Sequence, residues 1–552
     1  MLLILTVGGF FRFYGLMTGL PYSFHVDEWH IINDSLEMYS HNSLRPPTFD
    51  YPSLLYYLHV GLAALIGWFQ APSLYSLHIA GRITSAFFGT VSIGAVYLLG
   101  RGAYGKQVGL LAAALFACTV TALREAHFAT IDTLNALFII LSVHALIRIT
   151  AEGGLKHYLL AGIFIGLAAG TKYNGFLLTM PLFLAHVLRD IPASNSLQEL
   201  IRNCWQKWWI RVWQGHFLWS VMAMVVVFLV TTPFACLDPI HFVLFVGGKL
   251  LRCWAGVVAW NHHYFGTLPY VYYITNLLFW GMGPLLEAAG LSGMLYLLVR
   301  RRKPNLVIAS WTLLYFALVG IWFNKAARYA LPMLPFLAVG AAVLLVETKA
   351  YLSNCNRRIW ASAWVLLIAA VLGSGLLYSM AYLRIYAYPH TGIQALRWSL
   401  ANIPSGSTVL LEPTEWERPP IDGGAALVPA AFSAVDAGRY RFKYLDVLKF
   451  ADGHADPDDL RVLLKQTLDN VDYIVMSIRW CEGLESSPIA SPVIRSYYRN
   501  LGQENGNFIK VAEFTSYPGL WGSEWNDDWS ELNFRIFDHP RVMIFKRRNL
   551  NR

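Results

Sequence analysis

Apolar stretches of similar length recur along the first 382 residues of the chain and limit what it can fold into. A helix rises about 1.5 Å per residue, so about 20 apolar residues cross the hydrocarbon core of a bilayer. About 11 stretches approach this length: 2–17, 76–99, 107–124, 127–147, 157–171, 173–189, 215–236, 272–298, 305–322, 328–347 and 359–382. Only 14% of the residues are charged, against about 25% in a soluble domain. The sequence therefore predicts a mainly α-helical, polytopic membrane protein.

One further apolar stretch, 51–69, is interpreted differently. Pro46 and Pro47 precede it, and tyrosine and histidine interrupt it, so we expect an interfacial helix in the first outer loop. With the N-terminus inside, this choice leaves about twice as many Lys and Arg residues in the inner loops as in the outer ones. Basic residues favour the cytoplasmic side, whereas an additional span at 51–69 would reverse every later loop.

The C-terminal part of the chain, 384–552, is more charged and contains Pro and Gly turns. Helices are predicted around 398–400 and 460–468, and strands at 408–411, 473–476 and 541–545. We therefore expect a membrane domain at 1–383 and a small α/β domain at 384–552. An odd number of spans from an inside start places this second domain on the extracytoplasmic side of the cell membrane.

The net charge of +9 and the six cysteines limit the function classes further. Most basic residues lie in short loops between apolar stretches, which is typical of topology signals, so nucleic acid is not an expected partner. No CxxC or Cys/His spacing indicates a metal site, and no cofactor is firmly predicted, although a divalent cation is left open. Residues 1–17 lack a basic start and a small-residue cleavage site, so we expect a first span rather than a signal peptide.

The adjacent acids Asp27 and Glu28 lie between the first apolar stretch and the others. Ionisable residues at membrane depth cost free energy and are by default candidates for a functional site. Further polar residues gather at the predicted outer ends of later spans, all on one side of the membrane. They are Arg124, His127, Asp132, Lys172, Tyr173, His262, His263, Tyr264, Arg328 and Tyr329. On a continuous helix, Arg124 and Asp132 would share one face.

Structural roles are open for these residues as well. The acid pair could cap the helix that follows it, and Lys172 and Arg328 could extend to lipid headgroups. His127 could be a buried, hydrogen-bonded histidine. His262 and His263 resemble a metal-binding pair, but adjacent histidines on a regular element rarely bind one ion. Because no third ligand has a fixed spacing, a metal site is not predicted.

Taken together, the polar residues favour chemistry over these structural roles. Cations at the membrane surface suit a lipid phosphate, and a neighbouring carboxylate suits a general base for an incoming hydroxyl. This combination predicts glycosyl transfer from a polyprenyl-phosphate carrier to a hydroxyl acceptor. Two alternatives stay open. A lipid-linked-sugar flippase or transporter would carry ionisable groups near the bilayer midplane, often with internal repeats, and a non-catalytic membrane scaffold would need no carboxylate beside cations.

Five stretches of the sequence resemble a known group of enzymes. They are Asp27-Glu28, 52–57, 124–132, 170–173 and 328–335. Their order, spacing and predicted membrane side are similar to those of lipid-linked-sugar glycosyltransferases of the GT-C fold. The similarity is to prokaryotic members of the group that contains dolichyl-phosphate-mannose protein mannosyltransferases and aminoarabinose transferases. The ending 538–542 also resembles that of members with an outer C-terminal domain.

The resemblance implies a role for each matched position. Asp27 would be the general base that deprotonates the acceptor hydroxyl, with Glu28 in support. The other matched positions would bind the donor, either at its phosphate (Arg124, Lys172, Arg328) or around its sugar (His127, Asp132, Tyr173, Tyr329). The loop 262–264 matches only as a possible part of the site.

The resemblance also implies the kind of reaction. Members of this fold usually invert the anomeric centre, and their partners are a polyprenyl-phosphate sugar, a hydroxyl-bearing protein, lipid or glycan, and membrane lipid. No Trp-Trp-Asp signature occurs in 384–552, which disfavours transfer of a whole oligosaccharide to Asn. No insertion resembles the β-trefoil of eukaryotic protein mannosyltransferases, so a protein acceptor is not specifically indicated.

Overall fold

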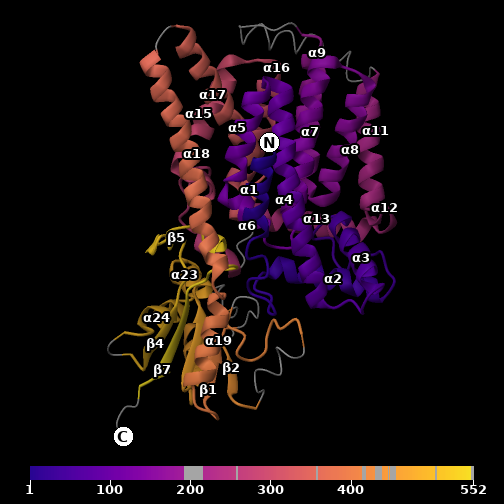
Figure 1. Cartoon of the computed structure of the whole chain (residues 1–552). Coiled ribbons are helices and arrows are strands. Elements are labelled where there is room, and N and C mark those ends of the chain that lie inside the picture. Colours follow the sequence, from indigo (N-terminus) through magenta and orange to yellow (C-terminus); the bar gives the residue numbers. More distant parts are fainter. Residues whose placement is uncertain are drawn as a thin grey trace.

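The computed structural model describes residues 1–191, 215–255, 259–355, 358–412, 418–428, 438–445, 447, 450, 456–503 and 506–548. Figure 1 shows a bundle of long helices and, below its lower end, a smaller part built around a β-sheet. The helical part comes first in the sequence and the sheet part last.

Long helices build the bundle and pack closely through small residues. They are α1 (Leu2–Phe13), α4 (Leu74–Tyr104), α5 (Lys106–Ala117), α7 (Asp132–Glu152), α8 (Leu155–Thr171), α9 (Thr179–Arg189), α11 (His216–Thr231), α15 (Pro284–Arg300), α16 (Lys303–Ile321), α17 (Leu334–Asn354) and α18 (Arg358–Ala387). A Cβ atom on Gly162 of α8 would lie 2.1 Å from the Ser220 carbonyl oxygen of α11. Such close contacts between backbones are typical of helix bundles in membranes.

Several helices of the described chain are long and apolar enough to cross a membrane. Five stretches qualify: α4, α7, α16, α17 and the run of α18 with α19 (Thr391–Asn402). A bent pair ending in α15 would make a sixth, and α1, α3 (Leu54–Gly67), α5, α8 and α11 are shorter apolar helices. These helices support a multi-pass membrane protein, whereas the number of 11 spans stays a prediction.

One predicted span is interrupted, and one helix considered from the sequence does not form. The stretch 272–298 is not one helix, because η3 (Tyr273–Leu278) and α14 (Phe279–Met282) meet α15 at an angle of 119°. Gly283 adopts a φ of +80° at the bend, which glycine tolerates, and a proline then begins α15. Likewise, α6 (Val120–Glu125) ends before α7 begins, and the residues between them form turns. The continuous helix considered for Arg124 and Asp132 is therefore not formed.

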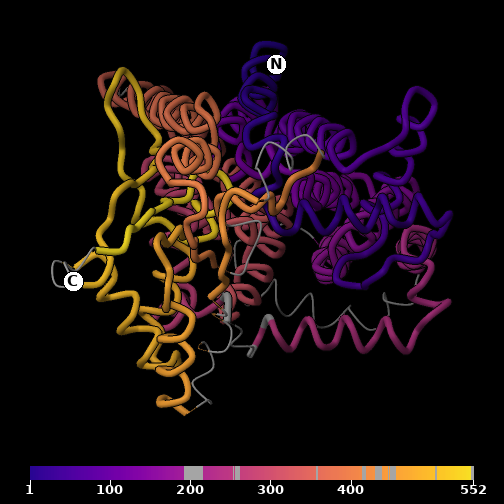
Figure 2. The backbone as a smooth tube through the Cα atoms, turned by 90° about the horizontal axis from the view of Figure 1, so that it is seen from below, coloured from indigo at the N-terminus to yellow at the C-terminus, as the bar shows by residue number. Residues whose placement is uncertain are grey.

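Short helices occupy the lower end of the bundle. α2 (Val26–Ser40) and α3 lie there, together with α12 (Phe234–Leu237) and α13 (Pro239–Ala255) (Figure 1). Figure 2, viewed from below, shows the orange and yellow C-terminal part beside the indigo and violet region of α2 and α3. The loop predicted as the first outer loop and the C-terminal part therefore share one end of the bundle. The position of α3 relative to a bilayer stays a prediction.

The main sheet has five strands in the order β2-β1-β3-β7-β4. They are β1 (Thr408–Leu411), β2 (Arg441–Tyr444), β3 (Tyr473–Ser477), β4 (Phe508–Phe514) and β7 (Val542–Arg547). β2, β1 and β3 are parallel, and β7 is antiparallel to both β3 and β4. β1, β3 and β7 coincide with the three predicted strand segments.

Helices cover both faces of this sheet. Ile474 and Met476 of β3 pack with α22 (Pro457–Leu468), α23 (Ile478–Glu485) and α24 (Pro492–Asn500). Tyr473 and Val475 point to the other face and pack with α19. This alternation is the period of two expected of a strand buried on both faces. The predicted domain boundary between 383 and 384 falls within α18, and the division stays a prediction.

The chain between β4 and β7 returns from the sheet to the bundle. It contains the hairpin strands β5 (Gly519–Leu520) and β6 (Ser523–Glu524) and the short helix α25 (Leu532–Arg535). We call residues 517–539 the returning segment. Its contacts with the bundle shape the surroundings of the site.

Candidate active site

Asp27 and Glu28 follow one another in the first turn of α2, yet their surroundings differ. His25 caps this helix, and its Nδ1 accepts a hydrogen bond from the Glu28 backbone N–H at 3.3 Å. Successive helical residues point about 100° apart. The Asp27 side chain is 19% exposed, whereas the Glu28 side chain is fully buried. Only Asp27 is therefore open to a reactant.

Glu28 is held within the protein by three hydrogen bonds. Its carboxylate accepts from Arg82 Nε at 2.7 Å and Nη2 at 2.8 Å, and also from the Ala129 backbone N–H at 2.9 Å. Arg82, on α4, donates in addition to the carbonyl oxygens of Leu16 and Thr18. A bidentate Arg–carboxylate pair fixes geometry as well as charge. Glu28 thus ties α2 to α4 and to the turn before α7.

Asp27 has two side-chain partners from distant parts of the chain. Arg328 Nη1 donates to Asp27 Oδ2 within an ion pair, and the Tyr51 hydroxyl donates to Oδ1 at 3.3 Å. Burial raises the pKa of Asp27, but the positive charge of Arg328 opposes it, and the resulting pKa lies well below the usual range. The carboxylate is therefore ionised at neutral pH.

Asp27 belongs to a group of polar side chains at the lower end of the bundle. Arg328 lies in η4 (Ala327–Ala330), and the ring of the next residue, Tyr329, is 5.2 Å from Lys172 Nζ at the end of α8. Lys172 donates to Asp132 Oδ1, at the start of α7, at 2.8 Å. The structure thus brings together five of the predicted site residues, which we call the Asp27 cluster: Asp27, Asp132, Lys172, Arg328 and Tyr329.

The loop before α3 lies against the Asp27 cluster. Lys249, on α13, places its Nζ 3.8 Å from the centre of the Tyr51 ring and donates to the Asp50 carbonyl oxygen at 2.5 Å. Tyr173, the first residue of η1 (Tyr173–Leu178), donates to the Phe49 carbonyl oxygen at 2.9 Å. Lys249 therefore adds a cation next to the partner of Asp27, and Tyr173 supports the loop that carries Tyr51.

Arg124 and His127 lie in a second, buried group. Arg124 is 2% exposed and forms ion pairs with Glu125 and Asp538, the latter at 3.2 Å. The His127 ring stacks on Tyr386 with 4.0 Å between ring centres. The His127 imidazole is also hydrogen-bonded to the carbonyl oxygens of Leu123 and Tyr14. Both residues contact α18 or the returning segment.

Asp538 and His539 join the returning segment to α18. Asp538 accepts hydrogen bonds from the hydroxyls of Tyr382 at 2.9 Å and Tyr386 at 3.0 Å. The His539 imidazole lies between Asp538, at 3.0 Å, and Asp527, at 2.9 Å. Burial lowers the pKa of His539, but the two carboxylates raise it more strongly, to about 9. The imidazole is therefore a cation between two anions at neutral pH.

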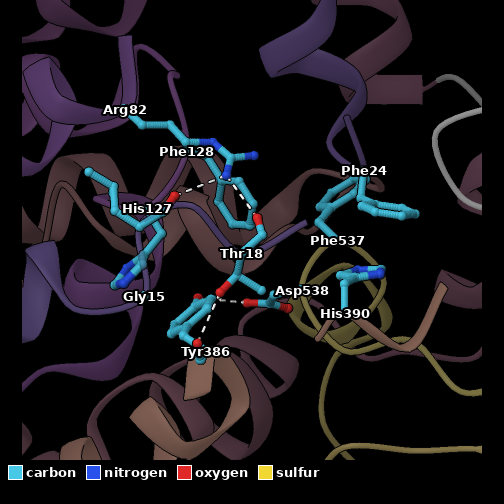
Figure 3. Close-up of a pocket in the computed structure, with 11 residues that line it drawn as sticks. Gly15, Thr18, Phe24, Arg82, His127, Phe128, Tyr386, His390, Phe537 and Asp538 are labelled. Carbon is cyan, nitrogen blue, oxygen red and sulfur yellow. Dashed lines mark hydrogen bonds between the residues drawn. The ribbon is translucent and has the colours of Figure 1, made fainter. Parts of the chain in front are cut away.

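A cavity of about 10 Å³ lies between this second group and Arg82 (Figure 3). His127, Tyr386 and Asp538 line it. Such a volume holds about one water molecule, so it cannot accept a sugar. The cavity belongs to the contact between the bundle and the returning segment.

The loop 262–264 also contacts the returning segment. It ends η2 (Ala259–Tyr264), and the Tyr264 hydroxyl donates to Glu531 at 2.8 Å. His263 Nε2 lies 3.4 Å from the same carboxylate, which also accepts from the Ala327 backbone N–H at 3.3 Å. His262 is buried. Among the described residues, no group of three or more potential ligands could hold a metal ion, and a role for a divalent cation stays a prediction.

Solved structures that resemble this chain over nearly its whole length are membrane glycosyltransferases. ArnT from Cupriavidus metallidurans, bound to undecaprenyl phosphate, matches with a TM-score of 0.50 and 15% identity over 98% of this chain and 97% of that chain. An oligosaccharyltransferase from Archaeoglobus fulgidus, tethered to an acceptor peptide, matches with a TM-score of 0.52 and 14% identity over 99% and 88%. At these identities the likeness shows the fold, which is GT-C.

A family model described as dolichyl-phosphate-mannose-protein mannosyltransferase matches residues 65–231. The matched stretch runs from the end of α3 to the end of α11 and contains Arg82, Asp132 and Lys172. The chain is a membrane glycosyltransferase of the GT-C fold. A search of curated proteins finds no match.

Several residues around the site of this glycosyltransferase were missed by the sequence analysis. Arg82 was detectable, because it is a lone charge inside the apolar stretch 76–99. Tyr51 and Lys249 follow no local pattern, since they meet only when the first loop packs against α13. Glu531 is likewise far from η4 in the sequence.

Proposed function

We propose that this glycosyltransferase moves one sugar from a polyprenyl-phosphate donor to a hydroxyl acceptor, with inversion, and that Asp27 is the general base. The observation that carries the proposal is the ionised, partly exposed carboxylate of Asp27 among Arg328, Lys172 and Lys249. Undecaprenyl phosphate in the similar ArnT and dolichol-phosphate in a similar archaeal enzyme support the class of donor. The description of the matching family supports it as well.

The ion pair between Asp27 and Arg328 indicates how donor binding activates Asp27 as a base. A carboxylate with a pKa below its usual range is a weak base, and general bases work best when their pKa is near the working pH. A donor phosphate near Arg328 would share the guanidinium, weaken its pairing with Asp27 and raise the pKa of that carboxyl. Donor binding therefore prepares Asp27 to accept a proton.

The transfer itself is a single displacement. The acceptor oxygen forms a bond to the anomeric carbon while the bond from that carbon to the phosphate oxygen breaks. The hydroxyl proton goes to Asp27, and the electron pair leaves with the polyprenyl phosphate. Arg328 and Lys172 stabilise this leaving group, an effect that is typically worth a few kcal/mol. Asp132 and Tyr329 border the sugar, whereas Glu28, Arg124 and His127 position the elements around it.

The proposal includes the predicted arrangement in the membrane. The lower end of the bundle, with α2, α3 and residues 384–552, faces the extracytoplasmic side, and 11 spans leave α3 at the interface. Helix α2, which carries Asp27 in its first turn, lies at the lower end of the bundle (Figure 1). The ion pair with Arg328 brings a second charge there, and a transferase working at the membrane surface requires its charges at such an end. A flippase would need them near the midplane.

Purified protein in liposomes, supplied with a panel of polyprenyl-phosphate hexoses and pentoses, tests this function. A cell-envelope extract supplies the acceptors. The released polyprenyl phosphate then measures turnover, so the acceptor need not be identified. Asp27→Asn is expected to lower turnover by about 10²–10⁴ and to keep or improve donor binding, because Arg328 becomes available. Asp458→Asn, at an exposed site on α22, is the matched control. Normal turnover by Asp27→Asn would contradict the assignment.

A further inference from the structure

The returning segment carries an exposed aromatic group at the border between the bundle and the sheet part. Trp521 is 87% exposed, Trp529 is 86% exposed and Trp525 is 39% exposed. Three exposed tryptophans within nine residues of one segment are unusual on a soluble surface, and exposed apolar surface of this kind marks a site of interaction. We call these three residues the tryptophan patch.

The backbone conformation at residue 521 does not favour a tryptophan. β5 and β6 pair through a two-residue turn at Trp521 and Gly522, whose φ angles are +51° and +83°. Both angles are positive, as in a type I′ hairpin, in which Asn, Asp or Gly is favoured at the first position. A tryptophan there is strained and covers almost nothing within the described protein. The turn itself therefore gives no reason for a large aromatic ring.

The hairpin is fixed firmly to helices of the bundle. Arg384, in the last turn of α18, donates to Glu524 at 2.6 Å and to the Tyr517 carbonyl oxygen at 3.1 Å. Asn276, in η3, donates to the Trp529 carbonyl oxygen at 3.0 Å. Figure 1 shows β5 beside α18, level with the lower end of the bundle. The tryptophan patch is thus held at one height relative to the apolar helices.

Apolar side chains that face outward continue from the bundle toward the hairpin. Leu377 and Met380 of α18 are 40% and 42% exposed, and Val271 and Ile274, next to Asn276, are 48% and 37% exposed. In a multi-pass protein, such outward apolar side chains face lipid. Tryptophan is enriched where this apolar surface meets the headgroups, because its ring is amphipathic.

The charges beside the tryptophan patch are paired. Glu524 pairs with Arg384, Asp527 pairs with His539, and Asp528 lies 3.5 Å from Arg535. Paired charges are less costly near a headgroup layer than free ones. Ser523, Glu524 and Asn526 are exposed beside Trp521 and Trp525, so the hairpin presents aromatic rings next to polar groups, as a surface in the headgroup layer does.

We propose that the β5–β6 hairpin lies in the membrane interface, with Trp521 and Trp529 among the lipid headgroups. The hairpin then fixes the height of the C-terminal sheet over the bilayer through Arg384 and Asn276. The partner is the lipid surface itself, because the patch continues the lipid-facing side of α18. This inference rests on the multi-pass character of the chain and is independent of the proposed sugar transfer.

Fluorine NMR of the full chain in nanodiscs tests the proposal. The protein carries 5-fluorotryptophan, and the resonance lost in Trp521→Phe is assigned to Trp521. A nitroxide lipid labelled near its headgroup is expected to broaden this resonance at least fivefold more than a soluble gadolinium chelate does. Trp529→Phe assigns the second ring in the same way and replaces the first variant if that one fails to fold.

A tryptophan introduced at an exposed site far from the bundle is the control. Tyr444→Trp lies on the edge strand β2, where the native side chain is 50% exposed, and its resonance is expected to respond to the soluble chelate alone. If the resonances of Trp521 and Trp529 also respond to the soluble chelate alone, the proposal is overturned. Protection from both probes would also overturn it, because another protein chain would then cover the patch.

Discussion

Asp27 and Arg328 lie 301 positions apart in the sequence and form an ion pair at the lower end of the helical bundle. Their side chains are 19% and 21% exposed, whereas those of the neighbouring pair, Glu28 and Arg82, are 0% and 4% exposed. A partly exposed pair exchanges partners at modest cost, but breaking a buried pair costs several kcal/mol. The first turn of α2 therefore carries one exchangeable carboxylate and one fixed carboxylate.

Replacing Arg328 by methionine should change donor affinity and pH dependence together. Loss of the guanidinium removes a ligand for the donor phosphate, so the Kd for a polyprenyl-phosphate sugar is expected to rise about 10-fold or more. Since Arg328 lowers the pKa of Asp27, its loss should raise that pKa and move the acid limb of the kcat/KM profile to higher pH. Donor binding and turnover between pH 4 and pH 8 measure both effects.

Lys349→Met is the control for this variant, because Lys349 is an exposed cation near the end of α17. It should leave both the Kd and the pH profile unchanged. An Arg328→Met protein with wild-type donor affinity and an unshifted acid limb would show that Arg328 serves only the fold.

Glu28→Gln should affect stability more than chemistry. The substitution leaves the buried Arg82 guanidinium without its anion, and removing one member of such a pair typically costs about 3–5 kcal/mol. Thermal unfolding in detergent should therefore give a clearly lower Tm for Glu28→Gln than for Asp27→Asn. The fraction that stays folded should keep transferring sugar. Equal Tm values for the two variants would contradict the distinction between the two acids.

The sequence predicted the helices and strands of this fold better than the contacts between them. Apolar length was enough to place α4, α7 and α16, because lipid exposure imposes a long uniform pattern. The break at Gly283 was visible as a Gly-Pro step within 272–298, but the apolar pattern runs through it. The pairing of Glu28 with Arg82 depends on how two helices pack, and no local pattern records that.

The candidate site shows the same limit. Asp27, Lys172 and Arg328 meet as predicted at one end of the bundle, because each lies where a helix begins or ends. Arg124 lies apart from these three residues. The turns between α6 and α7 separate it from α7, and the returning segment provides its partner, Asp538. That contact joins residues 414 positions apart, which only the folded chain reveals.

The cationic state of His539 should make stability depend on pH. Its pKa is about 9 in the folded protein, against about 6.5 in an unfolded chain. The folded state then binds more protons between these values, so the stabilisation is complete below pH 6.5 and is lost as the pH rises through 9. The loss amounts to about 3 kcal/mol at most. The Tm should fall between pH 6.5 and pH 9.

His539→Gln should remove most of this slope and lower the Tm at pH 6.5. His41→Gln, at an exposed histidine after α2, should preserve the wild-type slope. If the wild-type Tm is the same at both pH values, the imidazole is not charged in the folded state.

Glu531 links the returning segment to the position of Arg328. Its carboxylate accepts hydrogen bonds from Tyr264 and from the backbone N–H of Ala327, the residue before Arg328. Glu531→Gln keeps the size of the side chain but weakens both hydrogen bonds, because charged acceptors form stronger ones. We expect η4 to shift, the Kd for the donor to rise about 3- to 10-fold and kcat to change less, since each weakened hydrogen bond is worth about 1 kcal/mol.

Glu524→Gln removes a carboxylate from the same segment without touching η4, because its partner is Arg384. Donor affinity should therefore stay at the wild-type value in this control, although the hairpin loses an ion pair. A Tm matched between the two variants would exclude a general loosening of the segment as the cause. If Glu531→Gln binds the donor as tightly as Glu524→Gln does, the returning segment holds the sheet part in place but does not position Arg328.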